Sequence, residues 1–161
     1  PATMIAWVKY VVSSVGNEEA AEEGLGGAAG GVDVTTGGID AEAYRPVVQK
    51  LVDKFGFKKV AITLRESESA DDNKWSAIYF DGDEILMGNK YAVRIVDRVG
   101  GGDSFASGLI YGFLATGDPQ QAVEYGAAHG ALAMTTPGDT SMATLAEVER
   151  LMSGGSARIQ R

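Results

Sequence analysis

The chain contains no cysteine and a single histidine, His129. The absence of cysteine excludes disulfides, thiolate metal sites and a cysteine nucleophile, and it fits a reducing compartment. Having only one histidine also removes the usual histidine-containing zinc sets and the serine–histidine triad. Small residues surround His129 in the sequence, which favours a packed or surface histidine over a catalytic one.

Positive charge is scarce as well, since 14 lysines and arginines stand against 22 acidic residues and give a net charge of -8. This balance repels nucleic acid and anionic membranes, so we expect neither as a partner. A phosphate-bearing ligand would have to be held locally, by backbone amides or single cationic side chains. No apolar run approaches the ~20 residues of a membrane span, and no secretory signal pattern stands out. We therefore expect a soluble, cytoplasmic protein.

The 161 residues, 45% of them hydrophobic, do suffice for one domain with its own core. Apolar patterns of strand and helix type alternate along the chain, which predicts an α/β fold. Residues 75–80 and 84–87 flank the Asp81–Gly82 turn and predict an antiparallel hairpin. The other predicted strands cover 11–15, 58–64 and 91–96. The predicted helices cover 4–12, 17–23, 40–55, 103–115, 119–134 and 144–151, with a glycine-rich connection at 24–38 and an unstructured tail at 153–161. We expect Asp40 and Asp118 to cap their helices, with Pro119 in the first turn of the latter, and Thr144 to form a capping box with Glu147.

The most informative stretch is a glycine turn, Gly100, Gly101 and Gly102, between the strand ending at Val96 and a helix beginning at Asp103. Glycines let the backbone approach a ligand closely. The free N–H groups of a helix's first turn point at such a ligand, with the positive end of the helix dipole behind them. The sequence therefore predicts an anion site at this turn.

Asp103 allows two compatible roles at the start of that helix. It could cap the helix, or it could accept a proton from a substrate hydroxyl that attacks a phosphoryl group held by the amides. The Walker pattern is absent, so spacing alone does not decide between the two. Arg98, just before the glycine turn, could contact a phosphate or could be a solvated charge.

The segment DRVGGGDSF resembles the DTxGAGDxF signature of the ribokinase-like (PfkB-type) carbohydrate kinases, with Arg98 in place of threonine and Gly101 in place of alanine. VAITLRES at 60–67 and GVDVTTG at 31–37 are similar to the 2-keto-3-deoxygluconate kinase branch. The resemblance covers residues 7–151. It implies a three-layer α/β/α (Rossmann-like) half-domain over 1–152, the nucleotide-binding C-terminal half of such a kinase.

The resemblance also implies ATP and Mg2+ as cofactors and a set of site residues. Asp103 would be the catalytic base and the glycine turn the anion hole. Thr63 and Arg65 would lie near the nucleotide phosphates. The family's magnesium-associated motif matches only at Asn17, because Ala20 stands where an acidic residue belongs. An adenine-side wall is implied at Ala127, Gly130 and Gly138.

Two alternatives stay open beside this kinase interpretation. The small residues Ala122, Gly126 and Gly130 could serve close helix packing instead of forming a nucleotide wall. The family's N-terminal half, which supplies most sugar contacts, has no counterpart in the resemblance. We therefore expect a truncated or engineered half that binds nucleotide only or, if active, uses a sugar-acid substrate. A catalytically silent scaffold is the alternative, and an uncovered sheet edge and apolar face predict a homodimer or larger assembly.

Overall fold

The computed structural model describes residues 13–17, 41–67, 69 and 71–154. The helices predicted at 4–12 and 17–23, the connection at 24–38, the Asp40 cap and most of the tail lie outside these residues, as does the GVDVTTG segment. The chain divides into two compact units, one containing the described residues up to Ile62 with Ile78–Leu86, the other Thr63–Ala77 with the described residues from Met87 onward.

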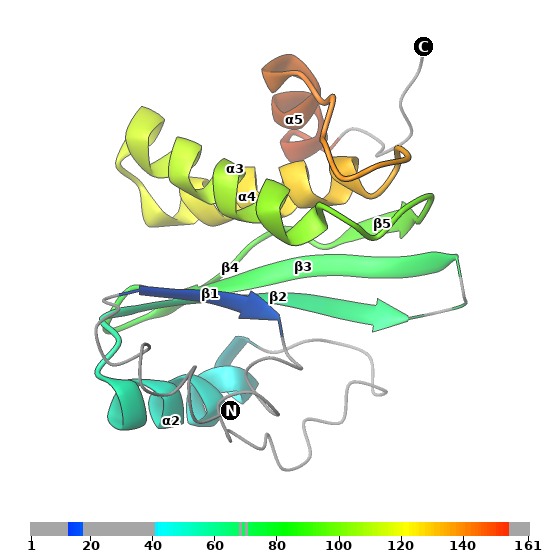
Figure 1. The fold of residues 1–161 in the computed structure, drawn as a ribbon. Helices are drawn as coiled ribbons and strands as arrows, with labels where there is room; N and C mark the ends of the chain where they lie inside the picture. The colour runs from blue at the N-terminus through cyan, green and yellow to red at the C-terminus, as the bar shows by residue number, and fades with distance from the viewer. Residues whose placement is uncertain (1–12, 18–40, 68, 70, 155–161) are drawn as a thin grey trace. The chain divides into compact units, whose positions relative to one another are not determined.

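Along the described residues, one strand and one helical segment are followed by four consecutive strands and then by three consecutive helices, so strands and helices do not alternate throughout as the sequence predicts (Figure 1). The five strands form one sheet in which β1, β2, β3 and β4 are successive neighbours and β5 pairs with β3. The strands are β1 (Ser13–Asn17), β2 (Lys59–Ser67), β3 (Asp72–Phe80), β4 (Ile85–Met87) and β5 (Tyr91–Arg94). The helices are the 3-10 turn η2 (Ala41–Tyr44), α2 (Arg45–Phe55), α3 (Gly101–Thr116), α4 (Pro119–Ala133) and α5 (Leu145–Met152).

In the first unit, α2 buries one apolar face, formed by Val47, Val48, Leu51 and Phe55. Gly56 ends the helix in the left-handed conformation, with φ 72°, as its position after the apolar pattern predicts. The predicted hairpin is confirmed, because β3 and β4 are neighbours and the amide of Asp81 donates to the carbonyl of Glu84 at 3.1 Å.

The second unit contains β5 and the helices α3, α4 and α5. Strand β5 runs antiparallel to the start of β3, with Trp75 opposite Tyr91 and Asn73 opposite Val93. It ends at Arg94, earlier than predicted, because the amide of Val96 turns away from the sheet and donates to the carbonyl of Met134 at 2.9 Å.

Local signals set the ends of α4 and α5. Asp118 caps α4 by accepting from the amide of Gln120, with Pro119 in the first turn, as predicted. Thr144 and Glu147 form the predicted capping box at the start of α5. None of the helices in the part of the chain that the structure describes is both long and apolar enough to span a membrane.

Small residues allow α3 and α4 to pack closely. A Cβ atom added at Gly112 would lie 2.5 Å from the Cα atom of Ala122, and one at Gly126 would lie 2.8 Å from the ring of Phe105. Real Cβ atoms do not approach other atoms so closely, so the two helices need glycine at these contacts. The helix-packing interpretation of the small residues is confirmed for this pair.

Candidate functional site

The glycine turn forms the start of α3. Gly100 is the N-cap residue and adopts a left-handed conformation with φ 81°, which favours glycine. The amide of Ser104 donates to the carbonyl of Gly100 at 2.9 Å, so Gly101 and Gly102 already belong to the first helical turn. This is why α3 begins two residues before the predicted start at Asp103.

The first turn of α3 has the geometry of an anion site. The amides of Gly101, Gly102 and Asp103 precede the first intrahelical donor, so the helix itself supplies no acceptor for them. A Cβ atom added at Gly102 would meet nothing within 4 Å, which shows that the space beside this residue is open. Backbone donors at an open, positively polarised helix end can bind a phosphate-like group.

Asp103 is the third residue of α3, and its side chain is exposed. The N-cap position belongs to Gly100, so the prediction that Asp103 caps the helix is wrong. The carboxylate lies instead within the same helical turn as the open amides. A proton acceptor beside a bound phosphoryl group requires this kind of placement.

Asp97, which received no role in the sequence argument, connects the glycine turn to the segment after α4. One carboxylate oxygen accepts from the amide of Val99 at 3.0 Å, and the other accepts from the amide of Gly138 at 3.0 Å. These backbone hydrogen bonds hold the pKa of the half-buried Asp97 carboxyl below its usual value. The local Asp97–Val99 bond is a turn that an aspartate after a strand can signal, whereas the bond to Gly138 spans 41 residues.

A direct backbone contact joins the same two segments. A Cβ atom added at Gly100 would collide with the carbonyl oxygen of Asp139 and lie 2.9 Å from its carbonyl carbon. Gly100 is therefore required both by its left-handed conformation and by the approach of this neighbouring backbone. Gly138, predicted as part of the site, lies next to that contact and has φ 93°.

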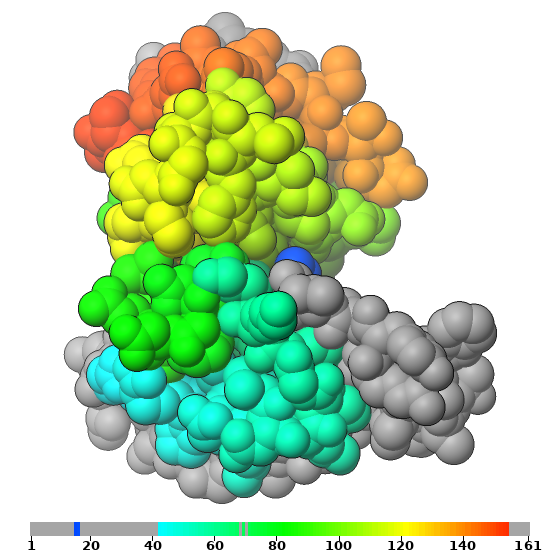
Figure 2. All heavy atoms as spheres, turned by 90° about the vertical axis from the view of Figure 1, so that its left-hand side faces the viewer, coloured from blue at the N-terminus to red at the C-terminus, as the bar shows by residue number. Residues whose placement is uncertain are grey.

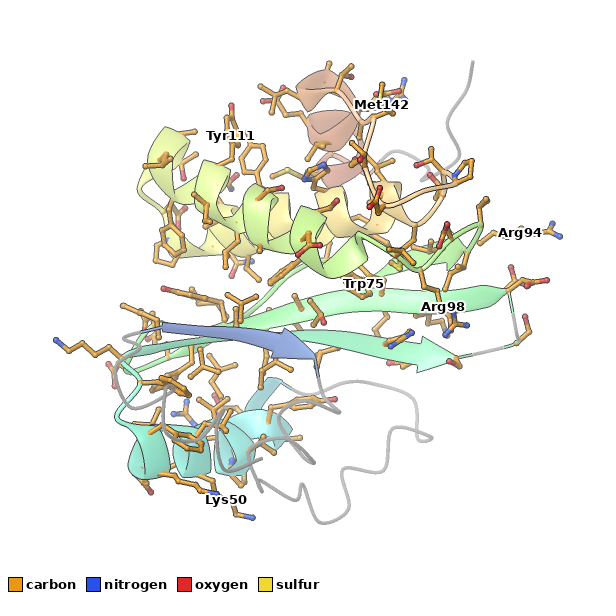
Figure 3. All side chains as sticks on the ribbon, viewed as in Figure 1. Lys50, Trp75, Arg94, Arg98, Tyr111 and Met142 are labelled. Carbon is orange, nitrogen blue, oxygen red and sulfur yellow. The ribbon has the colours of Figure 1, made fainter. Side chains whose placement is uncertain are left out.

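The remaining predicted phosphate ligands occupy separate elements. Thr63 lies on β2 with only 6% of its surface exposed, and Arg65 lies two residues further along the strand and is half-buried. Arg98 is exposed, two residues before the N-cap of α3 (Figure 3). Asn17 is the last residue of β1, and its side chain lies outside the described part of the structure.

The two α4 residues predicted as an adenine wall are packed against the protein itself. Ala127 is fully buried, and its carbonyl accepts from the indole Nε1 of Trp75 at 3.1 Å. A Cβ atom added at Gly130 would lie 2.9 Å from Cζ2 of Trp75. The space beside each residue is thus taken by Trp75, which favours the packing role over a nucleotide wall.

His129 is a packed histidine, as its small neighbours suggest. Its Nδ1 lies 3.1 Å from the hydroxyl of Ser107 on α3, and its Nε2 lies 2.9 Å from the hydroxyl of Ser141. Burial lowers the pKa of this imidazole below its usual value. The ring therefore connects α3, α4 and the segment before α5 in its neutral form at neutral pH.

A metal centre built from side chains alone is not present among the described residues, which contain no group of three or more His, Cys, Asp or Glu able to hold an ion. Mg2+ at nucleotide sites usually keeps several waters and is held by one or two carboxylates together with substrate phosphates. The exposed Asp103 beside the open amides is compatible with that mode.

An α/β fold whose strand leads through a glycine turn into a helix N-terminus is an arrangement that recurs in phosphate-binding proteins. Comparison with known families makes the assignment specific. A model of the pfkB family carbohydrate kinases matches residues 34–145, and the chain belongs to this family.

Individual relatives agree with the family. The chain is 30% identical over 115 residues to the 2-dehydro-3-deoxygalactonokinase of Haloferax volcanii, a match that covers 71% of this chain and 34% of that protein. It is 41% identical to the crystal structure of 2-dehydro-3-deoxygluconokinase from Thermotoga maritima, with a TM-score of 0.80, covering 95% of this chain and 44% of that one. A putative 2-keto-3-deoxygluconate kinase from Enterococcus faecalis, 23% identical with a TM-score of 0.71, shares the fold. The chain thus has a ribokinase-like α/β fold and spans less than half the length of these relatives.

Proposed function

We propose that this chain carries the phosphate-binding and proton-accepting site of an ATP-dependent kinase for a 2-keto-3-deoxy sugar acid. The observation that supports it most is the first turn of α3, where the exposed Gly102 and the exposed Asp103 carboxylate lie among backbone amides for which the helix supplies no acceptor. The sugar-acid class is suggested by the names of the relatives from Haloferax volcanii and Thermotoga maritima.

The residues of this turn would have different roles in phosphoryl transfer. The amides of Gly101 and Gly102 would hold the phosphate oxygens and stabilise the charge that spreads over them in the transition state. The Asp103 carboxylate would accept the proton of the sugar hydroxyl as its oxygen forms a bond to the γ-phosphorus and the bond to ADP breaks. Mg2+, carried by the nucleotide, would neutralise the phosphate charges. Arg98 could supply a further positive charge from the segment before the turn.

Two measurements test this function. Calorimetry of the 161-residue chain with ATP and Mg2+ should show binding, and the absence of heat at high protein concentration would contradict a nucleotide site. A coupled assay of ADP release with 2-keto-3-deoxygluconate should show turnover about 10²–10⁴ times slower for Asp103→Asn than for the parent chain. Asp53→Asn, an exposed carboxylate on α2, is the matched control and should leave the rate unchanged. Equal rates for the parent and Asp103→Asn would remove Asp103 from the mechanism.

A second function, self-association without catalysis, has one observation in its favour. Ile110 and Leu114, one turn apart on α3, are 59% and 83% exposed. The end of α3 that carries Leu114 faces the viewer in Figure 2, in yellow-green. An exposed apolar strip on a helix whose only charged residue is Asp103 is typical of a surface that another molecule covers.

A further inference from the structure

The glycine turn rests on α4, and α4 rests in turn on Trp75 of β3. A Cβ atom added at Gly130 would lie 3.1 Å from the carbonyl oxygen of Gly101, 2.9 Å from Cζ2 of Trp75 and 3.1 Å from Nε1 of Trp75. The indole and the glycine turn therefore both approach Gly130 at the place where a side chain would stand. Figure 3 shows Trp75 extending from β3 toward the helices.

Two further contacts fix this arrangement. The indole Nε1 of Trp75 donates to the carbonyl of Ala127 at 3.1 Å, so the ring cannot rotate away without losing a buried hydrogen bond. A Cβ atom added at Gly101 would lie 3.1 Å from Cγ of Met134, the residue that ends α4. The turn therefore contacts α4 at both Gly130 and Met134.

The packing of Trp75, α4 and the glycine turn affects where the amides of the turn lie. Packed interiors transmit displacements because they have few voids. A change of a few tenths of an ångström in the separation of Trp75 from α4 would therefore move Gly101, and with it the amides of Gly102 and Asp103. Binding that depends on several convergent donors is sensitive to such a shift.

We propose that Trp75 is a positioning residue for the phosphate site, acting through Gly130 on the glycine turn. This inference rests on the proposed function, because it assumes that the amides of α3 bind nucleotide phosphates. It differs from the adenine-wall role of Gly130, in which this residue would touch the base and leave the phosphate amides unaffected.

The test measures the affinity of the chain for two ligands, Mg2+-ATP and inorganic tripolyphosphate, which has phosphates but no base. Gly130→Ala should raise the Kd of both ligands about tenfold, because the methyl group displaces Gly101. Gly112→Ala overpacks the same pair of helices away from the turn, where the added Cβ meets Ala122. It measures how far a displacement is transmitted along the helices, and it should weaken binding of both ligands less than Gly130→Ala does.

A second variant tests Trp75 directly. Trp75→Phe removes Cζ2 and Nε1, the two atoms that the added methyl group would meet. The double variant Gly130→Ala/Trp75→Phe should therefore bind both ligands more tightly than Gly130→Ala alone, a rescue that general destabilisation would not produce.

The outcomes separate the explanations. Weaker binding of ATP with unchanged binding of tripolyphosphate would overturn the inference and support an adenine wall. Equal weakening by Gly112→Ala, or no rescue in the double variant, would also overturn it. If the parent chain binds neither ligand, the proposed function fails and the inference falls with it, whereas a binding parent with an unaffected Gly130→Ala variant refutes the inference alone.

Discussion

Replacing Gly100 by alanine should be one of the most damaging single-methyl changes in the chain. Gly100 has φ 81°, and its added Cβ atom would collide with the backbone carbonyl of Asp139. The backbone of Asp139 cannot move aside easily, because it belongs to the segment that Asp97 holds through a hydrogen bond from the amide of Gly138.

The magnitude follows from two separate terms. The left-handed conformation costs alanine about 1–2 kcal/mol relative to glycine. Moving the Asp139 backbone to admit the methyl group costs about 1–3 kcal/mol more, as in other overpacked sites. The smaller conformational entropy of alanine in the unfolded chain offsets about 0.4–1 kcal/mol of this. We expect Gly100→Ala to lower the free energy of unfolding by about 2–4 kcal/mol.

Urea denaturation followed by circular dichroism measures this change. Because urea m-values for small proteins are about 1–3 kcal/mol per molar, the midpoint should fall by about 1–2 M. Gly102→Ala is the control, since its methyl group would meet nothing within 4 Å and alanine suits the helix, so it should raise stability by about 0.4–1 kcal/mol and should not lower it. A Gly100→Ala midpoint equal to that of the parent would refute the left-handed turn and its contact with Asp139.

Three further predictions concern a buried amide, a histidine and an apolar surface. Asn73 is 1% exposed, and neither its Nδ2 nor its Oδ1 has a hydrogen-bond partner among the described residues. Asn73→Leu should therefore raise the free energy of unfolding by about 1–2 kcal/mol, and a loss of stability in urea denaturation would contradict this. Burial lowers the pKa of His129, so the unfolded chain binds the proton more readily than the folded chain does. The free energy of unfolding should therefore be highest above the unfolded pKa of about 6.5 and should fall as the pH drops from there through the folded pKa. Thermal unfolding of His129→Gln should depend less on pH than that of the parent between about pH 7.5 and 5, and equal pH dependence would count against this role. Leu114 is 83% exposed and should promote self-association, so sedimentation should show a smaller species for Leu114→Lys than for the parent. A monomeric parent would show that this surface is not an interface.

Features that depend on neighbouring residues were predictable from the sequence. The caps at Asp118 and Thr144 and the hairpin around Gly82 follow from hydrogen bonds and backbone conformations within a few residues, and the structure confirms them. The helix that follows the glycines was also predicted, although only Gly100 precedes it, and Gly101 and Gly102 form its first turn.

Features that depend on distant residues were not predictable in the same way. The three glycines predict a turn of the chain and therefore a start of α3 at Asp103, yet Gly101 packs against Met134 and belongs with Gly102 to the first turn of the helix. The hydrogen bond from Gly138 to Asp97 and the contact of Trp75 with Gly130 join segments that no local pattern relates.

The two hydrogen bonds accepted by Asp97 also affect how the molecule opens. Because a single carboxylate holds the amides of Val99 and Gly138, the segment before α3 and the segment after α4 lose their common anchor in one event. Opening at one segment should therefore weaken the other. The protection factors of the two amides, measured against their intrinsic exchange rates at each pH, should fall together when this carboxyl group is protonated.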